Sequence, residues 1–319
     1  MTSQIRQFSW DDVEKLVPLC NASLLADGES AYVDENYFRL RFGVSAHFEQ
    51  GSFVAWQDDD PIGVNMTLYG RAGKGLATLY LHPDKRETEM PRQLIETSDE
   101  RLKDAAIPIT DGDKPIYLLR GVEAHLTDLQ ALLVDIGYED VRHFYGMKME
   151  LSNEVDTPLL AEGLRVITFN PQMHAEAIHS VYDKSFRDSW GVRDGVPFDS
   201  WKRTFMTEQM DYSLWFGVWD GNRMVGFSIC LVDPTGIEQG KVRALGVLSE
   251  YRKKGVGTFL LQYSFHKFIK HGLKRAARNV DTAADTNPLN IYTKAGMHID
   301  THSIIMRRIL RGNAEDIND

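Results

Sequence analysis

The stretch with the clearest chemical potential runs from Leu245 to Thr258, where an apolar strand, a polar turn, basic residues and two glycines lead into a long helix. Such a turn directs unpaired backbone N–H groups at one point, and the helix dipole adds partial positive charge there. Gly255 and Gly257 have no Cβ, so a phosphate can approach the backbone closely. Neither G-x-x-x-x-G-K-[ST] nor G-x-G-x-x-G is present. The order of elements predicts a loop that binds a phosphate or pyrophosphate.

A second block, Asp281 to Met297, contains a strand end, a short helix and a glycine stop. Asn287 suits the helix N-cap, Pro288 the first turn and Gly296 the C-terminal stop. Capping does not explain Tyr292, five residues after the N-cap. From the residues alone, it is either a core tyrosine or a functional phenol.

Together the two blocks resemble the GCN5-related N-acetyltransferase (GNAT) superfamily. Its Arg/Gln-x-x-Gly-x-Gly/Ala signature is matched by Arg252, Gly255 and Gly257. The resemblance covers about Arg165 to Leu310 and, more faintly, the first half of the chain. It implies an acetyltransferase that uses acetyl-CoA and holds the coenzyme pyrophosphate on the glycine loop.

The resemblance also implies roles for single residues. Tyr292 would act as the general acid that protonates the leaving thiolate. The strand that precedes the loop would present backbone groups to the pantetheine and to the thioester carbonyl. The coenzyme-binding residues implied in this way are Leu245, Gly246, Val247, Arg252, Lys253, Lys254, Gly255, Val256, Gly257, Thr258, Asn287 and Tyr292.

The general base is where the chain departs from the superfamily. Many members have a glutamate at the position of Lys241, and a lysine is a poor base unless its pKa is strongly lowered. Glu238 and Asp188 are the nearest acidic candidates. The simpler interpretation of either is a surface carboxylate.

The acceptor side has its own candidates. Lys241 and Arg243 share one face of the strand and would bind an acidic group of the acceptor, unless they form only a solvated strand edge. Asp188 and Trp190 lie in a segment that resembles the acceptor-side loop of tandem family members.

These motifs belong to a pattern that the chain repeats after about 160 residues. Each half reads β-α-β-β-β-α-β-α-β, with early hairpins and late crossovers. This order predicts an α/β (α+β) sandwich with a mixed sheet, and the resemblance implies that its two halves are tandem GNAT-like domains. The predicted boundaries are 1–151 for a degenerate domain, 152–163 for a linker, 164–311 for the acetyl-CoA domain and 312–319 for a tail.

The first half keeps the scaffold but lacks the site residues. A glutamate brings negative charge to the phosphate position, and a proline removes an N–H. One working coenzyme site per chain is expected, and tandem enzymes such as mycothiol synthase are similar in this respect. The aligned pairs are Glu89 with Gly255, Pro91 with Gly257, Asp128 with Asn287 and Leu133 with Tyr292.

Composition excludes several classes of protein. The chain has 36 Lys and Arg against 46 Asp and Glu, a net charge of −10, which argues against a nucleic-acid partner. Cys20 and Cys230 stand alone, so we expect no disulfide framework and a reducing, cytoplasmic setting. Histidine spacing gives no metal site. We expect neither a membrane segment nor a signal peptide.

Three functions stay open at this stage. The leading one is an acetyl-CoA-dependent N-acetyltransferase of a small amine, acting as a monomer or homodimer. The second is an N-acetyltransferase of a protein or peptide amine, since an acidic surface could attract basic substrates. The third is a catalytically silent acyl-CoA-binding regulatory module, which the lysine at the expected base position keeps open.

Overall fold

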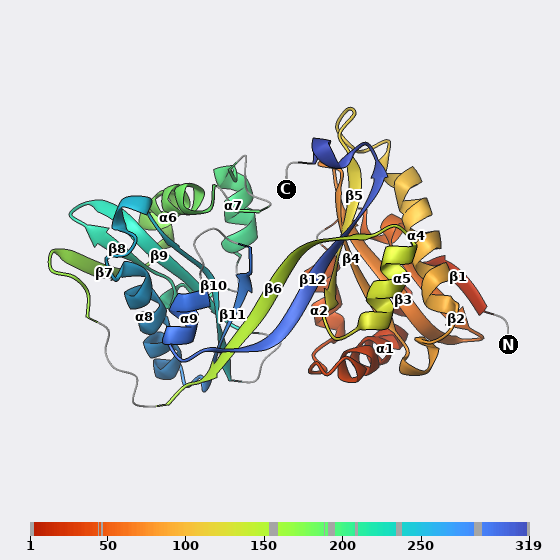
Figure 1. Ribbon diagram of the computed structural model, residues 1–319, viewed down its shortest axis with the longest axis horizontal. Helices are drawn as coiled ribbons and strands as arrows, with labels where there is room; N and C mark the ends of the chain where they lie inside the picture. Colours follow the sequence, from red (N-terminus) through yellow and green to blue (C-terminus); the bar gives the residue numbers. More distant parts are fainter. Residues whose placement is uncertain are drawn as a thin grey trace. The chain divides into compact units, whose positions relative to one another are not determined.

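The chain folds into two compact units, Met1–His143 with Ser303–Ile317, and Phe144–His302 (Figure 1). Each unit is a mixed β-sheet with helices packed on both faces, so the predicted fold class is confirmed. The computed structural model describes residues 3–43, 45, 47–152, 159–187, 189–190, 195–207, 210–233, 238–283 and 289–317.

In the N-terminal unit the sheet order is β1-β2-β3-β4-β5-β12, with β4 and β5 parallel and the other described pairs antiparallel. The strands are β1 (Ser3–Gln7), β2 (Phe53–Gln57), β3 (Asp60–Tyr69), β4 (Lys74–Leu81), β5 (Ile116–Glu123) and β12 (His298–Arg311). The helices are α1 (Val13–Ala26), α2 (Glu35–Phe42), α3 (Phe48–Gly51), α4 (Met90–Ala106) and α5 (Thr127–Asp135).

The C-terminal unit repeats this plan with the order β6-β11-β10-β9-β8-β7, in which β10 and β11 are parallel. The strands are β6 (Glu139–Glu150), β7 (Leu164–Thr168), β8 (Phe216–Asp220), β9 (Arg223–Val232), β10 (Gln239–Val247) and β11 (Arg275–Asp281). The helices are α6 (Pro171–Phe186), α7 (Phe198–Phe205), α8 (Val256–Lys270) and α9 (Leu289–Lys294).

Local sequence signals explain several element boundaries. The Asn170 side chain accepts hydrogen bonds from the first-turn N–H groups of α6, at 3.0 and 3.1 Å, and Pro171 begins the helix. Gly221, with a φ of 53°, makes the tight turn between β8 and β9. Both predicted hairpins form, β2–β3 and β8–β9, and each has a register shift at the equivalent place.

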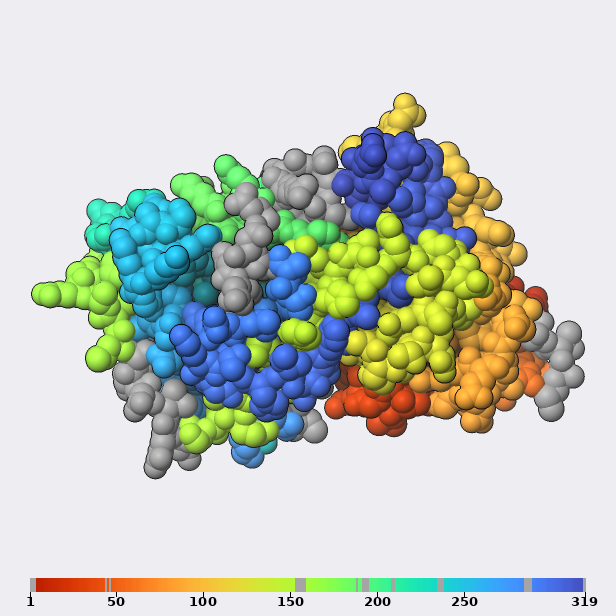
Figure 2. All heavy atoms as spheres, in the orientation of Figure 1, coloured from red at the N-terminus to blue at the C-terminus, as the bar shows by residue number. Residues whose placement is uncertain are grey.

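The last strand of each sequence half pairs within the other unit. From Phe144 onward β6 pairs with β11, with Glu150 opposite Arg275. From Ser303 onward β12 pairs with β5. Figure 2 shows the dark blue C-terminal segment among the yellow and orange atoms of the N-terminal unit. The compact units therefore differ from the sequence halves, whose boundaries at 151, 163 and 311 stay a prediction.

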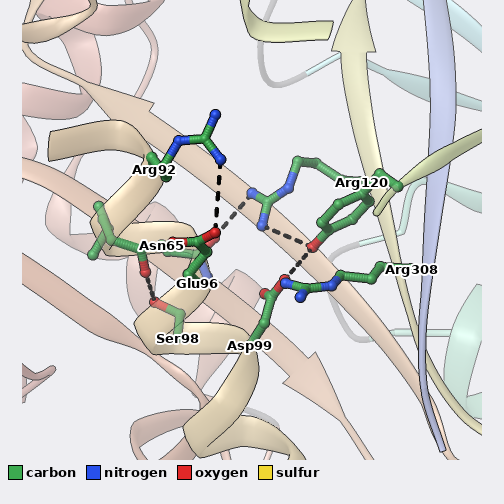
Figure 3. A network of polar contacts seen from close by, with 9 residues as sticks. Asn65, Arg92, Glu96, Ser98, Asp99, Arg120 and Arg308 are labelled. Carbon is green, nitrogen blue, oxygen red and sulfur yellow. Dashed lines mark hydrogen bonds and ion pairs between the residues drawn. The ribbon is translucent and has the colours of Figure 1, made fainter. Parts of the chain in front are cut away.

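A buried network of charges lies between β3, α4, β5 and β12 (Figure 3). Arg120 is 1% exposed and donates to Asn65 at 2.9 Å. Asp99 is fully buried and accepts from Tyr138 at 3.0 Å and from Arg308 of β12 at 2.8 Å. Burial raises the pKa of the Asp99 carboxyl, while the Arg120 and Arg308 charges oppose the rise. The network thus fastens the C-terminal strand to the N-terminal unit.

Candidate active site

Strand β10 has a one-residue bulge in the middle of the predicted site. Its register against β9 shifts between Val242 and Ala244, which makes Arg243 the inserted residue. A side chain at Gly240, before the bulge, would meet α8, whereas a side chain at Gly246, after it, would meet α6. One extra residue in a strand moves every later side chain to the opposite face, which accounts for this change.

The predicted site residues of β10 divide between the two faces. Arg243 lies on the α6–α7 face, where its Nη2 donates to the Thr204 carbonyl at 3.0 Å. Lys241 precedes it by two residues and is half-buried. Leu245 and Val247, beyond the bulge, pack with the first turns of α8. Arg243 therefore lies on the opposite face of the strand from Leu245 and Val247.

Strands β10 and β11 separate at this point. Their parallel register covers Gln239–Lys241 and Arg275–Ala277, and no further pair joins them in the described parts of the two strands. Arg278, the next residue of β11, donates through Nη1 to the Val242 carbonyl at 2.8 Å. Beyond this bridge, the edge of β10 has no strand partner among the described residues, so its backbone groups are available to a ligand.

The glycine loop forms the N-terminus of α8. Gly255 has a φ of 81° in the left-handed region and occupies the N-cap, with no side chain capping the helix. The first described helical hydrogen bond runs from the Phe259 N–H to the Gly255 carbonyl at 2.9 Å. The N–H groups of Val256, Gly257 and Thr258 precede it and have no intrahelical acceptor. Such a helix start is suited to bind an anion.

The basic residues of the loop act in different ways. Lys253 and Lys254 are exposed, and Lys254 Nζ lies 5.2 Å from the centre of the Tyr251 ring. Arg252 is also exposed, but it bonds the backbone: its Nε donates to the Val247 carbonyl at 3.2 Å, and its Nη2 to the Ser185 carbonyl at 3.4 Å. Arg252 thus fastens the strand end to α6, a role that the sequence does not predict.

Tyr292 lies on α9 and is 4% exposed. Its ring packs in the core, and the Arg278 guanidinium lies 5.8 Å from the ring centre. Among the described residues, no hydrogen bond reaches its hydroxyl. Helix α9 lies against the glycine loop, because a Cβ on Gly257 would be 3.3 Å from Ile291. The structure therefore brings the loop and the predicted acid's helix together.

The structure describes one of the two candidates for the general base, Glu238. Asp188 lies outside the described residues, as does the predicted cap Asn287. Glu238 lies just before β10 with a φ of 52°, and its carboxylate binds Lys274 Nζ at 2.8 Å. This is the paired end of the two strands, before the bulge and the separation from β11. Glu238 is thus engaged in an ion pair.

Sequence reasoning missed two residues of this region, Arg278 and Tyr182. Arg278 bridges the separating strands. Its strand also contains Arg275, Asn279 and Asp281, so no local sequence signal distinguishes Arg278. Tyr182 of α6 packs against Phe205 of α7, with ring centres 5.4 Å apart. Trp190, a predicted acceptor residue, lies 6.2 Å from the ring of Phe144.

The N-terminal unit has the same helix start with different residues. Glu89 occupies the N-cap of α4, as Gly255 does in α8, and Pro91 is the second residue of its helix, as Gly257 is. Leu133 of α5 is fully buried. The structure therefore aligns these positions as the sequence does.

The part of the chain that the structure describes contains no group of three side chains that could bind a metal ion. It has no helix with the length and apolarity to span a membrane. An open cleft of about 260 Å³ in the N-terminal unit is lined by charges of both signs around Trp56, far in sequence from the glycine loop.

Comparisons with known proteins agree with the geometry. Residues 175–297 match the Acetyltransferase (GNAT) family. A mycothiol acetyltransferase of Thermobispora bispora is 24% identical over 306 residues, which cover 93% of this chain and 96% of that protein. Another, of Geodermatophilus obscurus, is 25% identical over 325 residues, which cover 93% and 97%.

Two solved structures share the fold over nearly the whole chain. A GCN5-related N-acetyltransferase from Sphaerobacter thermophilus has a TM-score of 0.84 at 20% identity, covering 98% of this chain and 96% of that one. A tandem GNAT protein from the clavulanic acid biosynthesis pathway has a TM-score of 0.74 at 14% identity, covering 98% and 100%. At these identities the likeness concerns the fold alone.

Proposed function

Because the chain is an N-acetyltransferase with a GNAT-family domain in its C-terminal half, we propose that it transfers an acetyl group from acetyl-CoA to the amine of a small molecule. One coenzyme binds per chain, in the C-terminal half (164–311), while the N-terminal half (1–151) is a degenerate copy. The mycothiol acetyltransferase relatives support a small acceptor.

The start of α8 carries the proposal. Three consecutive N–H groups, on Val256, Gly257 and Thr258, lack helical acceptors. The left-handed Gly255 in front of them borders open space, because a Cβ added there would meet no atom within 4 Å. A pyrophosphate fits such donors, and the exposed Lys253 and Lys254 add positive charge. The unpaired edge of β10 next to it would bind the pantetheine through backbone groups.

Tyr292 is proposed as the general acid. Its ring is held by the core, and its hydroxyl has no competing partner among the described residues. A phenol at this place would protonate the thiolate that leaves when the amine attacks the thioester. Its helix lies against the coenzyme loop through Ile291, which supports this role.

For the general base, Asp188 is the stronger proposal. Glu238 is held by Lys274 at the closed end of the strands. Asp188 follows α6, whose Ser185 lies next to the Gly246 backbone beyond the bulge.

The test is Tyr292→Phe, assayed by release of free thiol from acetyl-CoA with a panel of amines. Removing the proton but keeping the ring should lower the turnover number by about 10²-fold or more and change coenzyme affinity little. Tyr263→Phe is the matched control, because Tyr263 is a half-buried tyrosine of α8 whose ring packs on Phe216 and Phe259.

Normal turnover by Tyr292→Phe would make Tyr292 a packing residue. Acetyl-CoA binding without thiol release on any amine would instead favour the silent module.

A further inference from the structure

On the α7-facing side of β10, the structure describes positive charge with no carboxylate paired to it. Lys241 and Arg243 are both half-buried, and neither forms an ion pair in the described part of the chain. The Arg243 guanidinium lies 4.4 Å from the centre of the Phe205 ring and donates once, to the Thr204 carbonyl. Burial lowers the pKa of Arg243, so this charge has lost part of its hydration.

The bulge in β10 places Arg243 on the face of the strand that contacts α7. In the N-terminal unit β4 pairs with β3 without a register shift from Gly63–Leu81 to Tyr69–Gly75, so that unit has no counterpart of Arg243. Bulges are frequent next to active sites, where they redirect a side chain. The insertion thus adds a guanidinium to the working half alone.

Tyr182 adds a hydroxyl to the same place. Burial raises its pKa, while the charges of Arg243 and Arg278 oppose the rise, so both guanidiniums act on this phenol. No described residue forms a hydrogen bond with the hydroxyl. Two cations and a free donor therefore converge where β10 and β11 separate.

In the N-terminal unit, a carboxylate offsets the charge of the arginine that corresponds to Arg278. Arg120 of β5 corresponds to Arg278 of β11, since each lies three residues after the first parallel pair of its strand. Asp99, the tenth residue of α4, supplies the charge beside Arg120, whereas the tenth residue of α8 is Phe265. A desolvated guanidinium without a counter-charge is costly, which favours an anionic ligand.

We propose that Arg243, assisted by Lys241 and the Tyr182 hydroxyl, binds the carboxylate of the acceptor. The substrate class is then an amine that also carries a carboxylate, such as an amino acid or a short peptide with a free C-terminus. The planar fork of an arginine pairs with both oxygens of a carboxylate, and Phe205 and Thr204 hold this one in place. The inference rests on the proposed acetyl transfer.

The experiment compares amino acids with their C-terminal amides as acceptors, using thiol release to obtain kcat/KM. Wild type should prefer the acids by at least about tenfold, the contribution expected of one hydrogen bond to a charged group. Arg243→Gln should bring the acid-to-amide ratio close to one, and Lys241→Gln and Tyr182→Phe should lower it in part. Arg165→Gln, which removes the same charge from β7, should leave the ratio unchanged.

Each outcome bears on a different claim. Equal use of acids and amides by wild type, or an unchanged ratio in Arg243→Gln, overturns the carboxylate site and leaves acetyl transfer standing. No thiol release with acids or amides also overturns the carboxylate site, and the wider amine panel then decides acetyl transfer. If Arg243→Gln does not fold, as judged by circular dichroism, the ratios of Lys241→Gln and Tyr182→Phe decide, because neither change removes the contact with Phe205.

Discussion

The two halves of this chain have arginines at equivalent positions, and these arginines differ in whether a carboxylate is paired with them in the described structure. Arg86 before α4 donates to the Ser23 carbonyl, as Arg252 before α8 donates to the Ser185 carbonyl. In the N-terminal half Arg86 also pairs with Asp27 at 2.5 Å. In the described part of the chain Arg252 has no carboxylate partner.

The second pair of arginines shows the same contrast. Arg120 lies beside the buried Asp99, whereas the described hydrogen bond of Arg278 goes to a backbone carbonyl and its guanidinium lies over Tyr292. Among the described residues, the N-terminal half thus pairs these arginines with its own carboxylates, whereas the corresponding arginines of the C-terminal half have no carboxylate partner. In both halves this arginine donates to a carbonyl of the unit's first long helix, from Arg86 to Ser23 of α1 and from Arg252 to Ser185 of α6. A contact present in both halves indicates that it stabilises the fold.

The largest effect is expected from Asp99→Asn, which removes the charge that offsets Arg120 and Arg308. A buried cation left without its partner should lower the free energy of unfolding by about 3–5 kcal/mol. Urea unfolding followed by circular dichroism measures the change.

Glu96→Gln is the matched control on the same helix. Glu96 lies 3.7 Å from Arg92 with both side chains at least one-third exposed, so its loss should cost no more than about 1 kcal/mol. Equal effects of the two substitutions would show that the buried network stabilises no more than a surface pair.

An intermediate effect is expected from Gly257→Pro. The change makes the start of α8 resemble that of α4, where Pro91 is tolerated at the same position. It removes one N–H donor, so acetyl-CoA should bind at least about tenfold more weakly in titration calorimetry.

Gly257→Ala retains the N–H and is the control, although its Cβ comes 3.3 Å from Ile291. Equal weakening by alanine and proline would attribute the effect to packing and not to the lost donor.

The smallest effect is expected from the converse change, Glu89→Gly with Pro91→Gly. It restores a glycine cap and the missing N–H to α4, yet the titration should still give one coenzyme per chain. Strand β4 has no bulge, and Leu133 stands where the other half has Tyr292. A second binding event would mean that the two substitutions alone had removed a site from the N-terminal half.

Local sequence signals are sufficient to predict several parts of this protein. The glycine loop at the start of α8, the short helix with Tyr292 and the Gly221 hairpin were all predicted, because a cap or a tight turn depends on residues only a few positions apart. The two-fold repeat was visible for the same reason, since each copy carries its own local signals.

Features that depend on residues far apart in the sequence could not be predicted. The bulge that inserts Arg243 exists only in the register between β10 and β9, and the backbone contact of Arg252 depends on Ser185, 67 residues away. The exchange of β6 and β12 is the furthest case. Strand β12 pairs with β5 across more than half the chain, and β6 pairs with β11 across more than a third of it. Hydrophobic patterning fixes which face of a strand is buried but not which edge it joins, because similar halves offer two equivalent edges.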